Sequence, residues 1–184
     1  MITKRIFLII WFILLIQFVY MMNFVMSDMA SAIVDASERP GCTEMPDISF
    51  GVTRDMAFQD LDCMGKEGRA VYKKESIEKD SIYPVSYGLF FAFTILTLSL
   101  PVFRKKWPVV VLTVIPLIGS LFDFIENHYL RRLVDQFPNL QTHTVAMANM
   151  ANIGKWSFIY TGIAIAAILT VWSFIRVIGN IRKG

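Results

Sequence analysis

The sequence lacks the motifs that identify common catalytic sites. It has no serine or cysteine in a nucleophile motif, no glycine-rich loop of the kind that binds phosphate, and no H-E-x-x-H zinc motif. Its 184 residues include two histidines and two cysteines, and it contains no internal repeat and no low-complexity tract. We therefore expect no metal site and no cofactor, and the positions of the polar residues become the main guide to function.

Four long runs, 6–26, 84–103, 107–127 and 155–176, contain almost no charge. Hydrophobic residues make up 55% of the chain, above the roughly 45 to 50% of typical soluble domains. Each run is close to the roughly 20 residues that cross a hydrocarbon core of about 30 Å as a helix. Because backbone groups in lipid must bond to one another, the runs should be helical.

The predicted fold is therefore an all-α integral membrane protein, a four-transmembrane-helix bundle that forms one membrane domain over residues 1–184. An extracytoplasmic loop subdomain at 27–83 separates the first two helices, and an outer connection at 128–150 joins the last two. The first run is longer than the 7 to 15 apolar residues of a signal-peptide core, so we expect it to remain as a helix.

Basic residues flank the runs on one side only, at positions 4–5, 104–106 and 176–183. Residues 27–81 instead hold twelve acidic and seven basic residues, a net charge of 5 negative. By the positive-inside rule both termini are cytoplasmic and the 27–83 loop is extracytoplasmic; Arg131 and Arg132 are exceptions. Small size and composition favour a bacterial inner (plasma) membrane. No basic face remains free, which argues against a nucleic-acid partner.

Both cysteines, Cys42 and Cys63, lie in the 27–83 loop, which favours a structural disulfide over a redox pair in an oxidising compartment. A short helix capped by Ser27 or Asp28 is predicted before Pro40. Residues 52–80 predict one or two polar helices, broken near glycines 65 and 68.

Small and aromatic residues indicate how the helices pack and where they meet the headgroups. Gly88 with Ala92, and Gly162 with Ala166, are small pairs at helical spacing that let backbones approach. The aromatic residues at the helix ends predict interfacial anchors; they are Tyr83, Tyr87, Trp107 and Trp156.

Polar residues gather where the third run ends and the fourth begins. Asp123, Glu126 and Asn127 share a helix face near the outer boundary, and we expect this helix to continue to Pro138. Lys155 opens the fourth run, and antiparallel neighbours place their adjoining ends together. We therefore predict an ion pair between Lys155 and one of the two acids, extended by the polar patch of Asn149 and Asn152.

One ammonium cannot neutralise two carboxylates, so the cluster has either a structural or a functional role. A binding site would use Asp123, Glu126, Asn127, Asn152 and Lys155. A membrane-embedded enzyme would use Asp123, Glu126 and His128 as acid and base, with Asn127 orienting the substrate. The histidines 128 and 143 alone are more typical of exposed interfacial residues.

The residues of the third and fourth runs also carry a resemblance. The sequence resembles a scattered group of small, uncharacterised multi-pass membrane proteins with D-x-x-E-N at a helix end, then Phe-Pro or Tyr-Pro and a lysine. The matching positions, all between 121 and 156, are Asp123, Glu126, Asn127, Phe137, Pro138 and Lys155. The four-span plan with a cysteine-paired outer loop is also similar to the claudin type, but this loop contains no tryptophan.

Binding is the favoured function. The expected partners are membrane lipids, a small amphipathic molecule or a membrane protein, which would meet Asp123, Glu126, Asn127 and Lys155 beneath the outer loop. A lipid-modifying enzyme that uses the two carboxylates is the alternative. A structural or assembly subunit of a membrane complex is a third possibility, and it predicts no pocket.

Overall fold

The computed structural model describes residues 2–38, 42, 46–74 and 82–181, which are helical apart from short connections and contain no strand. The elements are α1 (Ile2–Tyr20), a π-helical turn η1 (Met21–Val25), α2 (Met26–Ala36), α3 (Arg54–Val71), α4 (Ile82–Ser99), α5 (Lys106–Gln136) and α6 (Thr142–Ile181). Four helical stretches are long and apolar enough to cross a membrane: Leu8–Ala36, Ile82–Ser99, Lys106–Gln136 and Thr142–Arg176. The predicted fold class, an all-α four-helix membrane bundle, is confirmed.

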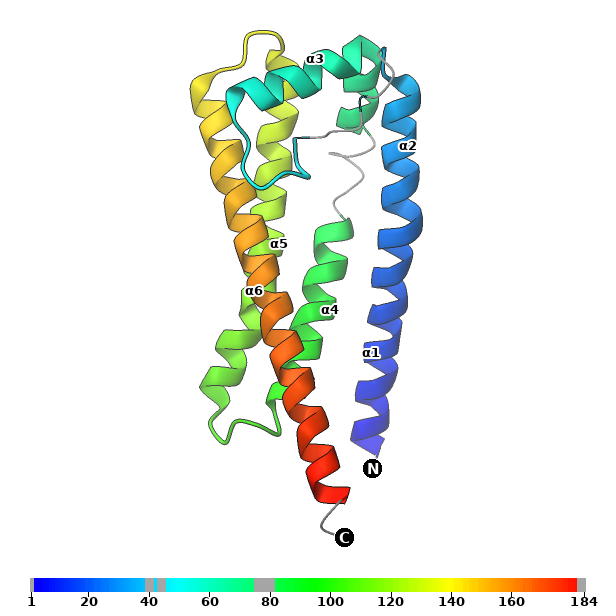
Figure 1. Cartoon of the computed structure of the whole chain (residues 1–184), viewed down its shortest axis with the longest axis vertical. Coiled ribbons are helices and arrows are strands. Elements are labelled where there is room, and N and C mark those ends of the chain that lie inside the picture. Colours follow the sequence, from blue (N-terminus) through cyan, green and yellow to red (C-terminus); the bar gives the residue numbers. More distant parts are fainter. Residues whose placement is uncertain (1, 39–41, 43–45, 75–81, 182–184) are drawn as a thin grey trace.

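The first span continues beyond its apolar run as one helix. Figure 1 shows α1, η1 and α2 in line. The prediction of a separate helix capped by Ser27 or Asp28 was wrong, because α2 starts after Val25, whose backbone is already helical at φ −68° and ψ −46°, and it has no side-chain cap. A capping side chain is needed only where the chain enters a helix from an extended segment. No proline or glycine interrupts the chain between α1 and α2.

The helices α4, α5 and α6 pack together, and α1 lies against α4. Glycines bring the helices close: a Cβ on Gly88 would collide with Ser120, and one on Gly162 would lie 3.3 Å from Pro116 Cβ. The predicted close approach at these two glycines is therefore confirmed. Trp11 on α1 donates a 2.9 Å hydrogen bond to Thr94 on α4, and Phe18 stacks on Phe90 with ring centroids 5.0 Å apart.

The last two spans extend well past the apolar runs. As expected, α5 continues almost to Pro138, ending at Gln136. α6 begins at Thr142, thirteen residues before Lys155, so most of the segment from 128 to 150 is helical. The connection itself covers only 137–141.

We call the region formed by α2, residues 46–53, α3 and the ends of α5 and α6 that adjoin residues 137–141 the head. In Figure 1 the head lies at one end, with α3 across it, and both termini lie at the other. The head has a packed apolar core that draws on every one of its helices. Its fully buried members include Ile33, Val52, Ala57, Leu61, Met64, Tyr72, Leu130, Leu133 and Ala148.

A disulfide joins Cys42, which lies between α2 and residues 46–53, to Cys63 of α3, with the Cα atoms 5.8 Å apart. The predicted disulfide is confirmed. The break in α3 lies at Gly65, where φ is +67°, a value that favours glycine. Gly68 stays helical. Residues 75–80, the end of the predicted polar helices, and Pro40, before which the first outer helix was to end, lie outside the described residues.

Candidate functional site

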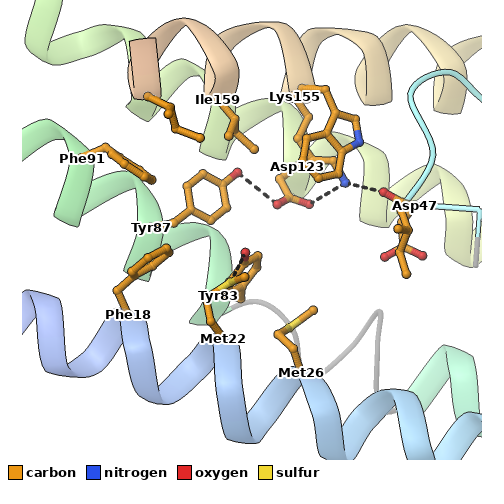
Figure 2. A pocket seen from close by; sticks show the side chains of 13 residues that line it. Phe18, Met22, Met26, Asp47, Tyr83, Tyr87, Phe91, Asp123, Lys155 and Ile159 are labelled. Carbon is orange, nitrogen blue, oxygen red and sulfur yellow. Dashed lines mark hydrogen bonds and ion pairs between the residues drawn. The ribbon is translucent and has the colours of Figure 1, made fainter. Parts of the chain in front are cut away.

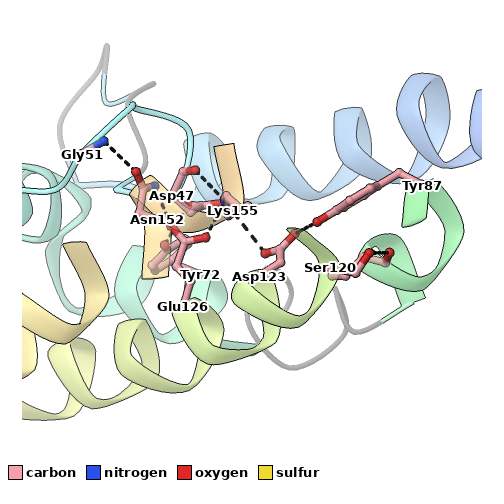
Figure 3. A network of polar contacts seen from close by, with 10 residues as sticks. Asp47, Gly51, Tyr72, Tyr87, Ser120, Asp123, Glu126, Asn152 and Lys155 are labelled. Carbon is pink, nitrogen blue, oxygen red and sulfur yellow. Dashed lines mark hydrogen bonds and ion pairs between the residues drawn. The ribbon is translucent and has the colours of Figure 1, made fainter. Parts of the chain in front are cut away.

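An ionic cluster lies where the head meets the spans (Figure 3). Lys155 Nζ on α6 is 2.5 Å from Glu126 Oε2 and 3.9 Å from Asp123 Oδ1, both on α5. Asn152, one turn from Lys155, donates a 2.7 Å hydrogen bond to Glu126 Oε1. All four side chains are almost fully buried. The structure thus brings Asp123, Glu126, Asn152 and Lys155 together, as the antiparallel arrangement predicted.

Residues 46–53, which we call the lid, cover this cluster through backbone groups. The Asp47 carbonyl accepts a 3.0 Å hydrogen bond from Lys155 Nζ. The amides of Gly51 and Val52 donate to the side-chain oxygens of Asn152, at 2.6 Å, and Asn149, at 2.8 Å. Sequence reasoning placed Asn149 and Asn152 in the polar patch and the outer loop above it, but it did not identify residues 46–53 or their backbone groups as the contacts. Backbone donors carry no residue-specific signal, and the proline- and glycine-rich composition indicated only turns.

Tyr72, at the end of α3, fixes the lid from the head side. Its hydroxyl donates a 2.8 Å hydrogen bond to Asp47 Oδ1, and its ring is completely buried. Burial, and secondly the negative charge of Asp47, raises the pKa of Tyr72 well above its ordinary value. The Tyr72 hydroxyl therefore stays protonated and keeps its role as a donor far into the alkaline range.

The two acids of α5 occupy different environments although they are one helical turn apart. Glu126 is fully buried beneath the lid, between Lys155 and Asn152. Asp123 lies one turn nearer the membrane interior, where Oδ2 accepts a 3.0 Å hydrogen bond from the Tyr87 hydroxyl of α4. Glu126 closes the cluster toward the head, and Asp123 faces the space between the spans.

That space is a cavity of about 250 Å³. In Figure 2 the side chains from α1, η1 and α2 face those from α4 and α6 across it, and the chain Tyr87–Asp123–Lys155–Asp47 runs along one side. The residues that line it are Phe18, Met22, Met26, Asp47, Ile48, Tyr83, Tyr87, Phe91, Asp123, Lys155, Trp156, Ile159 and Ile163. The cavity therefore has a polar end beneath the lid and an apolar remainder.

The π-helical turn η1 shapes one wall of the cavity. Met22 lies in the turn and Met26 directly follows it, and both side chains line the cavity. The wider turn leaves the Val19 carbonyl to accept a hydrogen bond from the Asn23 side chain at 2.9 Å. Single π turns inside α-helices are frequent at functional sites. Flexible methionine side chains suit a wall that adapts to different apolar shapes.

Three of the predicted interfacial anchors, Tyr83, Tyr87 and Trp156, line the cavity. Tyr87 is 2% exposed and bonded to Asp123, so the prediction of a headgroup-level anchor was wrong for this residue. Trp156 lines the cavity, and its indole N–H is buried without an acceptor among the residues that the structure describes. Trp107, by contrast, is 66% exposed, as an anchor should be. Residue type at a helix end could not distinguish these cases.

The remaining predicted site residues lie apart from the cavity. Asn127 is buried, but it does not line the cavity, and its amide nitrogen has no partner among the described side chains and backbone. His128 is exposed and packs edge-on against the Tyr129 ring. His143 is exposed on the first turn of α6. The constellation of Asp123, Glu126 and His128 is therefore not assembled around one space.

Metal binding has no evident place in the described ranges. Across residues 2–38, 42, 46–74 and 82–181 no three His, Cys, Asp or Glu side chains lie close enough together to hold an ion. The buried carboxylates of the cluster are engaged by Lys155, Asn152 and Tyr87 instead.

Comparison with known proteins finds no relative of this chain. No family model matches the chain, and no curated protein and no solved structure matches it. Function has to be inferred from the cavity and the cluster themselves.

Proposed function

We propose that this protein binds an amphipathic molecule from the membrane, with its polar head under the lid and its hydrocarbon part between α1 and α6. The observation that carries the proposal is the 250 Å³ cavity, which is polar at one end and apolar over the rest. Ligand sites are typically apolar pockets with a few converging polar groups. Here those groups are Tyr87, Asp123, Lys155 and the Trp156 indole N–H.

The cavity volume limits what enters. A volume of 250 Å³ corresponds to about eight water molecules at roughly 30 Å³ each. It holds a headgroup and the first part of one chain, so the remaining chain would extend along Phe18 and Ile163 into lipid. Ile163 lines the cavity and is 42% exposed, which supports an opening of the cavity at this end.

The other two functions fit the geometry less well. Acid–base catalysis by two carboxylates would need Glu126 to reach a substrate, but its side chain is fully buried beneath the lid. His128, the other acid in that hypothesis, is exposed outside the cavity. A purely structural subunit would have no reason to keep a cavity that ends in a buried ionic cluster.

For the orientation in the membrane we propose cytoplasmic termini and an extracytoplasmic head, in a bacterial plasma membrane. Basic residues flank the spans at the end that carries both termini. The disulfide lies at the opposite end, in the head, and disulfides persist in oxidising compartments. A ligand would then enter from the outer leaflet.

The proposal is tested by filling the cavity. Ile163→Trp places an indole in the apolar part, whereas Ile168→Trp adds the same group on the lipid-facing side of the same helix, where residue 168 is 68% exposed. Both variants and the wild type are extracted in mild detergent, and the lipids that co-purify are identified by mass spectrometry. We expect one amphipathic species to be enriched with the wild type and Ile168→Trp but lost from Ile163→Trp.

Equal lipid content in all three preparations would contradict binding in this cavity. Thermal unfolding of the two variants shows whether each is folded. Trapping the same species with a photoreactive residue at position 163, and not at position 168, gives a second readout within intact membranes.

A further inference from the structure

The charges around the cavity are unbalanced. Its lining contains two acidic side chains, Asp47 and Asp123, and one basic side chain, Lys155. A third carboxylate, Glu126, contacts Lys155 but does not line the cavity. No other cationic side chain lines the cavity among the residues that the structure describes. Counted by formal charge, with each carboxyl group ionised, the site is therefore short of positive charge.

Lys155 is committed mainly to Glu126 rather than to Asp123. Its Nζ is 2.5 Å from Glu126 Oε2 and 3.0 Å from the Asp47 carbonyl, which are hydrogen-bonding distances. The separation from Asp123 Oδ1, at 3.9 Å, is too long for a hydrogen bond. Of the two acids of α5, Asp123, which lines the cavity, is thus the one that Lys155 compensates less.

The Asp123 carboxyl group has room to accept further hydrogen-bond donors. Tyr87 donates to Oδ2, and the Lys155 ammonium faces Oδ1, so both oxygens point at hydrogen donors. An ionised carboxylate has about four lone-pair sites. One contact at 3.0 Å and one at 3.9 Å leave it able to accept another charged donor from the cavity.

Aromatic rings surround the same end of the cavity. Tyr83 and Tyr87 lie edge to face with centroids 5.2 Å apart, and both rings line the cavity together with Phe91. The negative faces of such rings attract cations, including quaternary ammonium groups. Trp156 also lines the cavity, and Lys155 Nζ already lies 5.1 Å from its ring centroid, so the protein uses this attraction itself.

From the carboxylate, the rings and the missing positive charge we infer that the ligand is a cationic amphiphile, with an amine or quaternary ammonium head beside Asp123 and a single hydrocarbon chain along Phe18 and Ile163. This inference rests on the proposed function and specifies the chemical class of ligand. A free alkylamine and a single-chain aminophospholipid share the ammonium head, although the phospholipid also carries a negative phosphate and is zwitterionic. The apolar walls take the chain, and the lid closes over the head.

The test compares the affinities of amphiphiles that share one chain length but differ in their polar group. Purified protein is titrated with dodecylamine, dodecyltrimethylammonium, dodecanol and dodecyl sulfate, and bound probe is counted by native mass spectrometry. Lysophosphatidylethanolamine forms a further arm. The cationic probes should bind at least about tenfold more tightly than dodecanol, and dodecyl sulfate more weakly than dodecanol. Tighter binding of the lysolipid than of dodecylamine would identify a phospholipid as the source, and the reverse a free amine.

Asp123→Asn removes the charge but keeps an oxygen that can accept from Tyr87. It should weaken binding of the cationic probes by about 30-fold or more and leave dodecanol unchanged. Glu67→Gln, which neutralises an exposed acid on α3, is the matched control and should bind like the wild type. The wild-type probe series decides the matter even if Asp123→Asn does not fold.

Two outcomes overturn the inference in different ways. If dodecanol or dodecyl sulfate binds as tightly as the cationic probes, and Ile163→Trp blocks that binding, the cavity binds amphiphiles but the cationic preference is wrong. If Ile163→Trp changes the binding of no probe, the proposed function fails together with the inference.

Discussion

The head and the spans of this protein are both helical, yet they are held together differently. The head buries a large apolar core, in which Leu61 and Leu133 are 1% exposed. The clustered core within the spans is small, with Ile95, Ala166 and Leu169 as its buried members. Water drives apolar side chains together in the head, whereas lipid solvates them equally well on either side of a helix. The spans therefore depend on close contacts and on the ionic cluster at the end nearest the head.

The largest expected effect comes from breaking that cluster. Lys155→Met leaves Glu126 buried without its cation, which should cost about 3–5 kcal/mol of folding free energy. Lys73→Met is the matched control, because Lys73 also lies 2.5 Å from a carboxylate, Asp135, but the two side chains of this pair are 32% and 54% exposed. An exposed pair is worth about 0–1 kcal/mol. Thermal unfolding in detergent measures the loss of stability in both variants. Equal melting temperatures for Lys155→Met and Lys73→Met would show that the cluster does not stabilise the spans.

The next effect compares buried leucines of the two regions. Leu61→Ala in the head should cost about 2–5 kcal/mol, because it loses burial from water and leaves a void. Leu169→Ala, at 6% exposure within the spans, should cost clearly less. There the unfolded side chain would stay in lipid, so only packing is lost. Chemical unfolding in mixed micelles gives both values, and a larger loss for Leu169→Ala would reverse the comparison.

A smaller effect is expected from the close contacts between spans. A Cβ at position 88 would displace the Ser120 hydroxyl, which donates a 2.7 Å hydrogen bond to the Pro84 carbonyl. Gly88→Ala should therefore cost about 1–3 kcal/mol. Gly162→Ala meets only Pro116 Cβ at 3.3 Å and should cost less. If both variants unfold like the wild type, the stability of the spans does not depend on the close helix contacts at these two glycines.

The smallest effect is a pH dependence that belongs to the head. The pKa of Tyr72 is raised from its ordinary value of 10.0 by burial and by Asp47. Above pH 10 the unfolded chain loses this proton while the folded protein keeps it, so stability falls as the pH rises through and beyond that point. Between pH 10 and pH 11 the wild type should lose about 1 kcal/mol more than Tyr72→Phe. Parallel stability curves for the two proteins would show that Tyr72 ionises freely.

Much of this organisation could be predicted from the sequence. Hydrophobic runs of membrane length indicated the spans, and helical spacing with antiparallel pairing placed Lys155 beside Asp123 and Glu126. Loop composition indicated the disulfide and the break at Gly65. These predictions succeeded because each depends on a local pattern or on a connection too short to allow another arrangement.

The cavity and its partners could not be predicted in the same way. The bond between Tyr87 and Asp123 depends on how α4 rotates against α5, and helix rotation has no signature in a single sequence. The lid binds through the Asp47 carbonyl and the Gly51 and Val52 amides, backbone groups that every residue type except proline offers. Because Glu126 and Asp123 share a helix face, their separation into a sealed and a cavity-facing acid also needed the structure.

The claim that the cavity binds an amphiphile is tested most directly by an experimental density map of the protein purified from its native membrane. We predict elongated density between Phe18 and Ile163, ending in a head about 3 Å from the Asp123 carboxylate. A map in which Phe18 packs directly against Ile163, so that nothing separates α1 from α6 at this level, would contradict it.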